Sequence, residues 1–419
     1  MTHAGKNGPR VAVTGLGAVS GLGWGAEALW AGLRAGRTAI RLFERFDHSG
    51  HRTHLAAEAP EPPAGAVRDL PGGSRLSLAD RFALFAALEA VAQAGLGASL
   101  ANEEAGVYFG SSTGGMFESE RFFSTFLGER RRYARLSSLA AQQVNSPGDA
   151  IARHLRITGP VQTVSSACAS GALALGAALD AVRSGEVEMA VAGGSDSLCQ
   201  LTYAGFNALR SVDERPCRPF RASREGMSFG EGAAVLVLER LDRALARGVE
   251  PLAVLDGAGA SCDAYHMTAP EPTGTGAAAA MDQALRDAGL PPEAIDFVNA
   301  HATGTPLNDA AEWRALTQVF GERAAALPVT ATKALIGHLL GSSGAIEAVA
   351  TVLSLRHGEL HPVPRAEEAQ TGVDPELPVA LVLDRPLSLE ARTAVSTSLA
   401  FGGSNAALVF SRWATGQAA

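Results

Sequence analysis

The sequence predicts an α/β protein in which helices cover both faces of the sheet. Short β-rich apolar runs alternate with amphipathic helical patterns along the whole chain, and several of these runs end in glycine-rich turns. The chain has 419 residues, 47% of them hydrophobic and 19% charged, which is enough to bury a large core. That core belongs either to two domains or to one large duplicated domain, although the letters contain no convincing repeat.

The predicted elements follow one another in two runs. The first consists of strands at 10–14, 107–109 and 188–192, a glycine-rich turn at 15–23, and helices at 25–35, 80–94, from about Cys168 to Gly185, and at 241–248. A strand then restarts at Leu252–Leu255, which divides the chain into predicted halves of residues 1–250 and 251–419. The second run consists of strands at 252–255, 295–299, 328–331, 379–383, 393–398 and 406–410, with helices at 309–320 and 343–357.

Composition and charge exclude several classes of protein. The net charge of −8 argues against a general nucleic-acid or membrane-surface binder, because both need a basic face. No apolar run reaches the roughly 18 residues that a membrane-spanning helix needs. The four cysteines, at 168, 199, 217 and 262, show no paired spacing, and the sequence has no recognisable signal peptide. These features predict a cytoplasmic protein that binds neither nucleic acid nor a membrane.

Two patterns resemble cofactor or metal sites but are better explained as loops. Residues 14–20 follow a strand as a dinucleotide-binding turn does, but Ser20 stands where the third glycine belongs and no acidic ribose-binding residue follows. His48, His51 and His54 are spaced by three, yet no acidic or cysteine partner is in register. We therefore predict no metal site and no cofactor of the protein's own.

Cys168 stands where a β-leaning run gives way to a predicted helix, among small residues from Val164 to Gly171. A cysteine in the first turn of a helix lies near backbone N–H groups and the positive end of the helix dipole, which favour the nucleophilic thiolate. The small neighbours let a substrate carbonyl approach the backbone, where an oxyanion hole can form. An inert buried thiol is the alternative, because cysteine is among the most buried residue types.

Two histidines and a lysine follow other predicted strands. His301 comes after the strand at 295–299, and Lys333 and His338 come after the strand at 328–331. Loops at strand ends often carry functional residues, so these three side chains together with Cys168 predict a catalytic site. Of the 35 basic residues only Lys6 and Lys333 are lysines, which hints that residue 333 must be an ammonium, although chance is the alternative.

These segments resemble the β-ketoacyl synthase family of the thiolase superfamily, and the resemblance extends over nearly the whole chain. Besides the cysteine and histidine segments, the matching stretches are Val13–Gly17, Arg218–Phe220, Gly230–Ala233, Asp263–His266, Thr268–Pro270 and Phe401–Asn405. The resemblance implies a thiolase-like fold, with duplicated α/β halves layered α-β-α-β-α. It also implies a β-ketoacyl-acyl-carrier-protein synthase of the type II fatty acid or polyketide kind.

Carried over residue by residue, the resemblance implies a role for each site residue. Cys168 would carry the acyl group, and His301 and His338 would stabilise the enolate that forms as the malonyl thioester loses carbon dioxide. Lys333 would organise the site electrostatically, with Glu347 as a candidate partner. The other implied roles are an oxyanion hole from the backbone N–H groups of Cys168 and Phe401, a gating loop with Gly402 and Gly403, pantetheine contacts from Thr303 and Thr305, and an acyl pocket with Thr113 and Phe401.

The chain departs from the family's usual pattern at a few positions. Ala302 and Ala400 stand where glycine is usual, and Arg221 stands where an acidic residue is common. Ala400 removes freedom from a moving loop, and Arg221 requires a rewired ion pair. Thr113 makes the acyl pocket more polar or more open than a large aliphatic residue would. These differences favour a specialised type II polyketide or polyene pathway over housekeeping fatty acid elongation, and they leave the acyl substrate open.

The resemblance also implies partners. Substrates arrive on the phosphopantetheine of an acyl carrier protein, which is acidic, so a basic docking surface is expected. Arg130, Arg131 and Arg132 form the strongest basic run, and Arg210 matches a position that is basic in the family; a solvated face is the alternative for the run. The implied assembly is a homodimer, or a heterodimer with a ketosynthase-like chain-length factor.

Two other classes stay open. A thiolase of this superfamily uses a second cysteine near its C-terminus, whereas the last cysteine here is Cys262. A chain-length factor, the non-catalytic partner of such synthases, lacks the nucleophile, so Cys168 and both histidines argue against that class.

Overall fold

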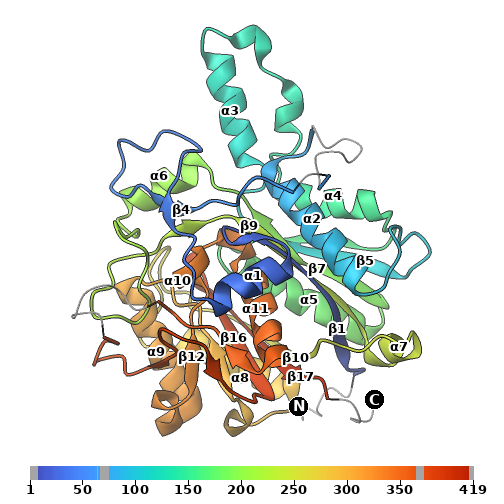
Figure 1. The fold of residues 1–419 in the computed structure, drawn as a ribbon, viewed down its shortest axis with the longest axis vertical. Helices are drawn as coiled ribbons and strands as arrows, with labels where there is room; N and C mark the ends of the chain where they lie inside the picture. The colour runs from blue at the N-terminus through green and yellow to red at the C-terminus, as the bar shows by residue number, and fades with distance from the viewer. Residues whose placement is uncertain (1–7, 64, 67–74, 365–371, 415–419) are drawn as a thin grey trace.

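Five strands from the N-terminal half form one side of a large mixed sheet (Figure 1). They are β1 (Val11–Ser20), β5 (Ala105–Gly110), β6 (Val161–Val164), β7 (Met189–Asp196) and β9 (Gly232–Arg240). The computed structural model, which describes residues 8–63, 65–66, 75–364 and 372–414, places them in the order β1-β9-β7-β5-β6. Strands β7, β5 and β6 are parallel, and β9 is antiparallel to both β7 and β1.

Five strands from the C-terminal half repeat this arrangement. They are β10 (Ala253–Cys262), β11 (Phe297–Asn299), β12 (Pro328–Thr330), β16 (Thr393–Leu399) and β17 (Ser404–Arg412). Their order is β10-β17-β16-β11-β12, again with three parallel strands and an antiparallel strand beside the first. The topology is therefore duplicated, although the amino-acid letters carry no visible repeat.

The first strands of the two sets join them into one sheet. Residues Val11–Val13 of β1 pair antiparallel with Ala253–Leu255 of β10. Two short strands complete the sheet: β2 (Gly23–Trp24) pairs with β1, and β14 (Ala380–Leu381) pairs with β12. Because β1 and β10 join the two sets of strands into one sheet, the sheet does not mark a boundary at residue 250, and the domain boundary predicted there stays a prediction.

The helices form three layers around the two sets of strands. Helices α5 (Ser170–Ser184) and α11 (Ser343–His357) lie together in the centre and contact strands of both sets. Helices α2 (Leu78–Gln93) and α4 (Ser146–Leu155) cover the first set, and α8 (Thr275–Ala288) and α9 (Pro306–Phe320) cover the second. This is the predicted α-β-α-β-α layering. The central α11 is buried along 13 of its 15 residues, as expected for a helix that is apolar on all sides.

The predicted glycine-rich turn at 15–23 is wrong, because β1 continues to Ser20. Gly15 and Gly17 lie beneath α2, where an added Cβ would come within 1.9 Å of the carbonyl oxygens of Ala90 and Ala86. These glycines therefore serve close packing of a strand against a helix rather than a turn.

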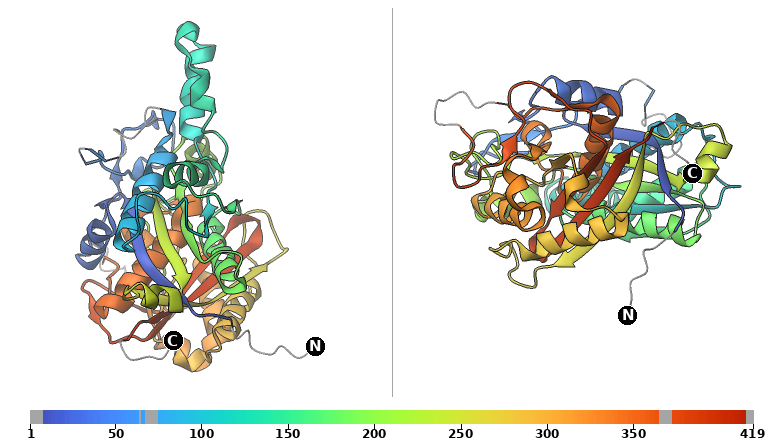
Figure 2. Two further views of the ribbon diagram at one scale, coloured as in Figure 1. Left: turned by 90° about the vertical axis from the view of Figure 1, so that its right-hand side faces the viewer. Right: turned by 90° about the horizontal axis from the view of Figure 1, so that it is seen from below.

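Residues 116–139 project from the body as an arm, at the top of Figure 1 and of the left-hand view of Figure 2. The arm contains α3 (Met116–Leu127) and two short 3₁₀ turns, Arg131–Tyr133 and Leu136–Leu139. The sequence patterns did not predict β9, α3, α4, α6 (Gln200–Ala208), α8 or α10 (Lys333–Ile336). The remaining elements are α1 (Ala26–Arg34), α7 (Leu241–Ala246), β3 (Arg41–Leu42), β4 (Leu55–Ala57), β8 (Phe229–Gly230), β13 (Glu359–Leu360) and β15 (Leu387–Ser388).

Candidate active site

Cys168 lies in the tight connection between β6 and α5. The sequence pattern placed the cysteine in the first turn of the helix. That placement is wrong, because the helix begins at Ser170 and the cysteine precedes it by two residues. Ala167 has a positive φ of 43°, a strained conformation for a residue with a Cβ. Its carbonyl accepts hydrogen bonds from Ser112 Oγ at 2.9 Å and Ser170 Oγ at 2.6 Å, which hold the turn in place.

The thiol of Cys168 is buried, and burial raises its pKa to about 11. The charge of Lys333 and backbone hydrogen bonds from Phe401 and Cys168 itself lower this pKa, whereas the Asp196 carboxylate raises it further. The desolvation of the thiolate outweighs the groups that lower the pKa, so the resting side chain is the neutral thiol. This differs from the thiolate that the helix-start position alone suggests.

His301 follows β11 and is fixed through its backbone and its ring. Its N–H donates to Glu312 Oε1 of α9 at 2.7 Å, and the N–H of Ala302 donates to Glu312 Oε2 at the same distance. The Nδ1 atom of the ring lies 3.1 Å from Lys333 Nζ. An ammonium only donates, so Nδ1 accepts and the hydrogen of the neutral ring lies on Nε2.

His338 is held in the same tautomer by different groups. The N–H of Leu340 donates to His338 Nδ1 at 3.1 Å, and Ser343 Oγ lies 2.7 Å from the same nitrogen. Nδ1 is therefore an acceptor, and Nε2 carries the hydrogen. His338 Nε2 is buried, and no side chain or backbone group of the described residues hydrogen-bonds it. It is a donor available to a ligand.

The two imidazoles are neutral and face each other edge to face. Their ring centroids lie 5.5 Å apart at an interplanar angle of 87°. Burial lowers the pKa of both His301 and His338 well below the usual value, and the positive charge of Lys333 lowers both further. The arrangement thus offers two neutral Nε2–H donors in one place, suited to a negative charge that develops on a substrate oxygen.

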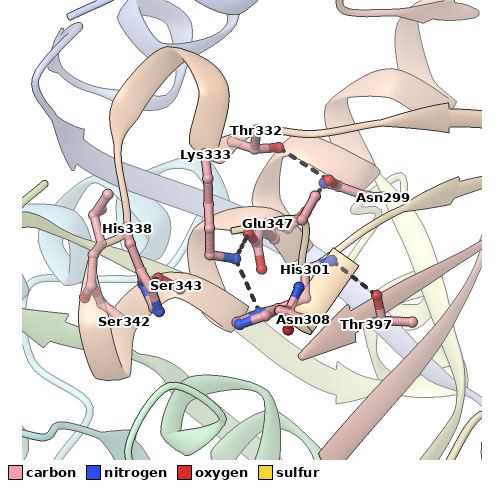
Figure 3. Close-up of polar contacts among 12 residues, drawn as sticks. Asn299, His301, Asn308, Thr332, Lys333, His338, Ser342, Ser343, Glu347 and Thr397 are labelled. Carbon is pink, nitrogen blue, oxygen red and sulfur yellow. Dashed lines mark hydrogen bonds and ion pairs between the residues drawn. The ribbon is translucent and has the colours of Figure 1, made fainter. Parts of the chain in front are cut away.

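Lys333 and Glu347 form a buried ion pair behind His301 (Figure 3). Lys333 is the first residue of α10, and Glu347 lies in the first part of α11. Burial raises the pKa of Glu347 to about 7, although the Lys333 ammonium opposes the shift. The Asn299 side chain donates to the Glu347 backbone carbonyl at 3.0 Å and accepts from Thr332 Oγ1 at 3.1 Å, which ties both loops to the pair.

Cys168, His301 and His338 line one pocket of about 240 Å³. Its lining also includes Phe401 of the predicted gating loop, the predicted pantetheine contacts Thr303 and Thr305, and the predicted docking residue Arg210. Phe401 closes one side and stacks on Phe206 of α6, with centroids 5.1 Å apart. The Oγ1 atoms of Thr303 and Thr305 lie 2.9 Å apart.

The loop that carries Phe401 depends on its two glycines. Gly402 and Gly403 have φ angles of 83° and 81°, and the Gly402 N–H donates to Met267 O at 2.8 Å. Ala400 has an extended φ of −130°, which any residue adopts, so the static loop needs no glycine there. Ala302, in contrast, has a φ of 43°, where glycine would be unstrained.

Some predicted residues lie away from the pocket. Thr113 is not among the residues that line it, and its hydroxyl donates to Asp196 Oδ1 at 2.9 Å, so its role in an acyl pocket stays a prediction. Arg130, Arg131 and Arg132 lie on the arm, where their guanidinium groups stack on aromatic rings. Arg221 is buried and donates to the carbonyl of Pro364 at 3.1 Å.

Several supporting groups carry no signal in the sequence. The Glu312 carboxylate accepts hydrogen bonds from the backbone N–H groups of His301 and Ala302. The Leu340 N–H and the Ser343 hydroxyl fix His338, and Asp196 accepts a hydrogen bond from the N–H of Gly341 in the same loop. Only the folded chain brings them to the site, because no spacing rule links them to the histidines.

The described part of the chain holds no cluster of three or more side chains arranged for a metal ion. His48 and His54 contact each other through their Nδ1 atoms at 2.9 Å, and His51 packs against Tyr203. No helix among the described residues is both long enough and apolar enough to cross a bilayer.

Comparison with known proteins shows the family of the chain. The model of the β-ketoacyl synthase N-terminal domain matches residues 9–244, and that of the β-ketoacyl synthase C-terminal domain matches residues 252–367. The chain belongs to the β-ketoacyl synthase family. It is an acyltransferase of the 3-oxoacyl-acyl-carrier-protein synthase class.

Individual relatives and solved structures are similar to this chain over nearly its whole length. The chain is 35% identical over 412 residues to a 3-oxoacyl-[acyl-carrier-protein] synthase 2 of Synechocystis sp., covering 96% of this chain and 98% of the relative. The solved ishigamide ketosynthase/chain length factor aligns with a TM-score of 0.90 at 35% identity, over 97% of this chain and 100% of the other. A type II polyketide ketosynthase, AntDE, solved with its acyl carrier protein AntF and a bound hexaketide, aligns at 0.86 and 26% identity over the same shares.

Proposed function

We propose that this protein joins an acyl group on Cys168 to a malonyl unit on an acyl carrier protein, with loss of carbon dioxide. The observation that carries the proposal is a pocket lined by a free cysteine and two neutral imidazoles, whose Nδ1 atoms accept hydrogen bonds and leave each Nε2–H as the donor. A pair of hydrogen-bond donors suits an enolate oxygen, and a thiol suits acyl transfer.

The reaction begins with acyl transfer. The Cys168 sulfur attacks the thioester of an acyl carrier protein, its proton leaves with the departing pantetheine sulfur, and an acyl-enzyme remains. The backbone N–H groups of Cys168 and Phe401 would hold the oxyanion, which is supported by the hydrogen bond that Phe401 makes to the thiol. The high pKa of the buried thiol means that the proton is lost during the attack rather than before it.

Condensation follows when malonyl-carrier protein enters. Loss of carbon dioxide leaves an enolate, whose oxygen would accept hydrogen bonds from His301 Nε2 and His338 Nε2. The enolate carbon attacks the acyl carbonyl, the carbonyl reforms as the Cys168 thiolate departs, and a proton from water restores the resting thiol. The product is a β-ketoacyl thioester two carbons longer, on the carrier protein. No metal or redox group is needed for this balance.

The pantetheine arm and the carrier protein would approach through the pocket mouth. Thr303 and Thr305 offer hydroxyl groups along the wall, and Arg210 supplies a positive charge there. The arginines at 130–132 lie on the arm instead, so their docking role depends on how the arm is placed against a partner. The AntDE:AntF complex supports a carrier protein as the partner of such a site.

We assign the substrate to a specialised type II polyketide or polyene pathway. The departures at 113, 302 and 221 and the likeness to the ishigamide ketosynthase support this pathway over primary fatty acid synthesis. The same likeness supports a heterodimer with a chain-length factor over a homodimer. Mass spectrometry of the acyl group trapped on Cys168, after incubation with native carrier proteins, tests the assignment: saturated fatty acyl groups alone would contradict it.

Alkylation with iodoacetamide tests the role of Cys168. Cys262 is exposed and will react first, so the assay needs a Cys262→Ser background. We expect alkylation of Cys168 to abolish condensation in step with its labelling. Cys168→Gln should abolish condensation yet keep malonyl decarboxylation, a result that a thiolase cannot give. Full condensation after complete labelling of Cys168 would refute the proposal, and the absence of decarboxylation in both forms would favour a non-catalytic chain-length factor.

A further inference from the structure

Asp196 is a buried carboxylate at the end of β7 that the proposed chemistry does not use. Its side chain is only 1% exposed. Oδ1 accepts hydrogen bonds from Ser111 Oγ at 2.8 Å, Ser112 N at 3.0 Å, Thr113 N at 2.8 Å and Thr113 Oγ1 at 2.9 Å. Oδ2 accepts from Ser112 N at 3.0 Å and from Gly341 N at 2.6 Å. One carboxylate thus binds two loops that lie far apart in the sequence.

The hydrogen bonds fit an ionised Asp196. Every partner is an N–H or O–H group that donates, so none of them requires a proton on the carboxyl group. Burial raises the pKa of Asp196, and the donors from residues 111 to 113 act in the opposite direction. A carboxylate that accepts several charge-assisted hydrogen bonds can remain charged in the interior.

One of the two loops contains His338. The Gly341 N–H that binds Asp196 follows Leu340, whose own N–H fixes the tautomer of His338. Leu340 has a positive φ of 52°, so this turn needs an external anchor. The anchor is close-fitting, because a Cβ on Gly341 would lie 2.7 Å from Asp196 Oδ2.

The other loop supports the nucleophile. Ser112, whose N–H binds Asp196, donates its hydroxyl to the carbonyl of Ala167. Ala167 is the strained residue immediately before Cys168. The carboxylate therefore reaches the nucleophile turn through Ser112 and the histidine turn through Gly341.

We propose that Asp196 is a positioning residue that holds His338 and Cys168 in register by anchoring these two turns. The proposal rests on the proposed function, because acyl transfer to Cys168 and malonyl decarboxylation at His338 both depend on the positions that Asp196 would maintain. Asp196 touches no substrate and acts only through Gly341 and Ser112.

Asp196→Asn is the substitution that separates the two turns. Four of the hydrogen bonds converge on Oδ1, so the amide oxygen will take that side and the NH₂ group will face the Gly341 N–H. Two donors then oppose each other, and the anchor of the His338 turn is lost. The variant also removes a negative charge that raises the pKa of Cys168.

The experiment measures both consequences. Malonyl decarboxylation, assayed in the Cys168→Gln background, should fall about tenfold or more in Asp196→Asn, because a catalytic donor is misplaced. Alkylation of Cys168, assayed against pH in the Cys262→Ser background, should move to lower pH. The charges that act on this thiol are those of Lys333 and Asp196, since His301 and His338 are neutral. The shift in alkylation reports the lost charge in a folded protein, and the slower decarboxylation reports the lost anchor; general loss of structure would not produce the two together.

Two matched variants complete the test. Ser111→Ala removes one donor to Oδ1 and leaves the Gly341 bond, so decarboxylation should change by less than about threefold. Gly341→Ala would place a Cβ 2.7 Å from both Asp196 Oδ2 and Ser112 Oγ, so it disturbs the contact between the two turns without changing the charge. Decarboxylation should fall while the alkylation profile does not move to lower pH, and this variant tests the anchor even if Asp196→Asn fails to fold. Folded Asp196→Asn protein with wild-type decarboxylation would overturn the proposal, as would equal losses in all three variants. If the wild-type protein neither decarboxylates nor condenses, the proposed function fails, whereas the shift of the alkylation profile can still be measured.

Discussion

Lys333 illustrates at the scale of one residue why this site uses an ammonium. Its Nζ lies 3.1 Å from His301 Nδ1 and pairs with Glu347, and the side chain is almost completely buried. A guanidinium is a planar fork with five donors, and it would leave several of them unpaired between one ring nitrogen and one carboxylate. The arginine-rich composition therefore gives way to lysine where the geometry favours a compact cation.

Lys333→Ala should reduce both stability and activity. It leaves the Glu347 carboxyl buried without its cation, and removing one member of a buried pair costs about 3–5 kcal/mol of unfolding free energy. It also frees His301 Nδ1, so the ring tautomer is no longer fixed and malonyl decarboxylation should fall by about tenfold or more. Urea unfolding and the decarboxylation assay measure the two effects. Lys333→Arg keeps the charge but not the geometry, and full decarboxylation in that variant would contradict the geometric argument.

At the scale of elements, local patterns predicted part of the regular structure, whereas β9, α3, α4, α6, α8 and the supporting contacts were not predicted. The pattern of α11 predicts residues 343–357, which are the observed bounds, because a helix is a local structure. The end of β1 was missed because Gly15 and Gly17 suggest a turn until the helix above them is known. The cysteine and histidine loops follow strands, so sequence patterns find them, whereas the Asp196–Gly341 contact spans 145 residues and depends on tertiary structure.

The packing of α2 on β1 gives a test at this scale. Gly17→Ala would place a Cβ 1.9 Å from the backbone oxygen of Ala86, so either β1 or α2 must move. Such overpacking costs about 1–3 kcal/mol, and the thermal midpoint should fall by several degrees. Gly50→Ala is the matched control, since a Cβ there meets no atom within 4 Å. Equal midpoints for the two variants would show that the close approach does not contribute to stability.

At the scale of the whole molecule, the duplicated topology explains how the site is assembled. Cys168 follows β6 and precedes α5, and His338 follows β12 and precedes α11, so they occupy corresponding places in the two halves. The two central helices pack together, which brings their starts and the two side chains into one pocket. His301 and Phe401 follow β11 and β16, at the carboxyl ends of strands of the parallel set. The site thus depends on both halves being folded together.

The many buried ionisable groups of the molecule make its stability depend on pH, in opposing directions. His361 is fully buried beside Thr330, and burial lowers its pKa to about 4. A lowered pKa in the folded state adds stability above the unfolded value near 6.5, and this stability is lost as the pH falls. Burial raises the pKa of Asp309 and Glu347 to about 7, so these carboxyl groups add stability as the pH falls below 7. The pH dependence of the unfolding free energy is therefore the sum of a histidine contribution and a carboxyl contribution of opposite sign.

Comparing variants isolates the histidine contribution. His361→Gln removes one titrating group and leaves the carboxyl groups unchanged, so their effects cancel in the difference between variant and wild type. The unfolded imidazole takes up a proton between pH 7.5 and 5.5 and the folded one does not, so the wild type should lose about 1.4 kcal/mol relative to His361→Gln over this interval. Urea unfolding at both pH values measures the difference, with His266→Gln as the control because His266 is exposed. A difference that stays constant with pH would mean that His361 accepts a proton inside the folded protein, and that burial does not keep it neutral.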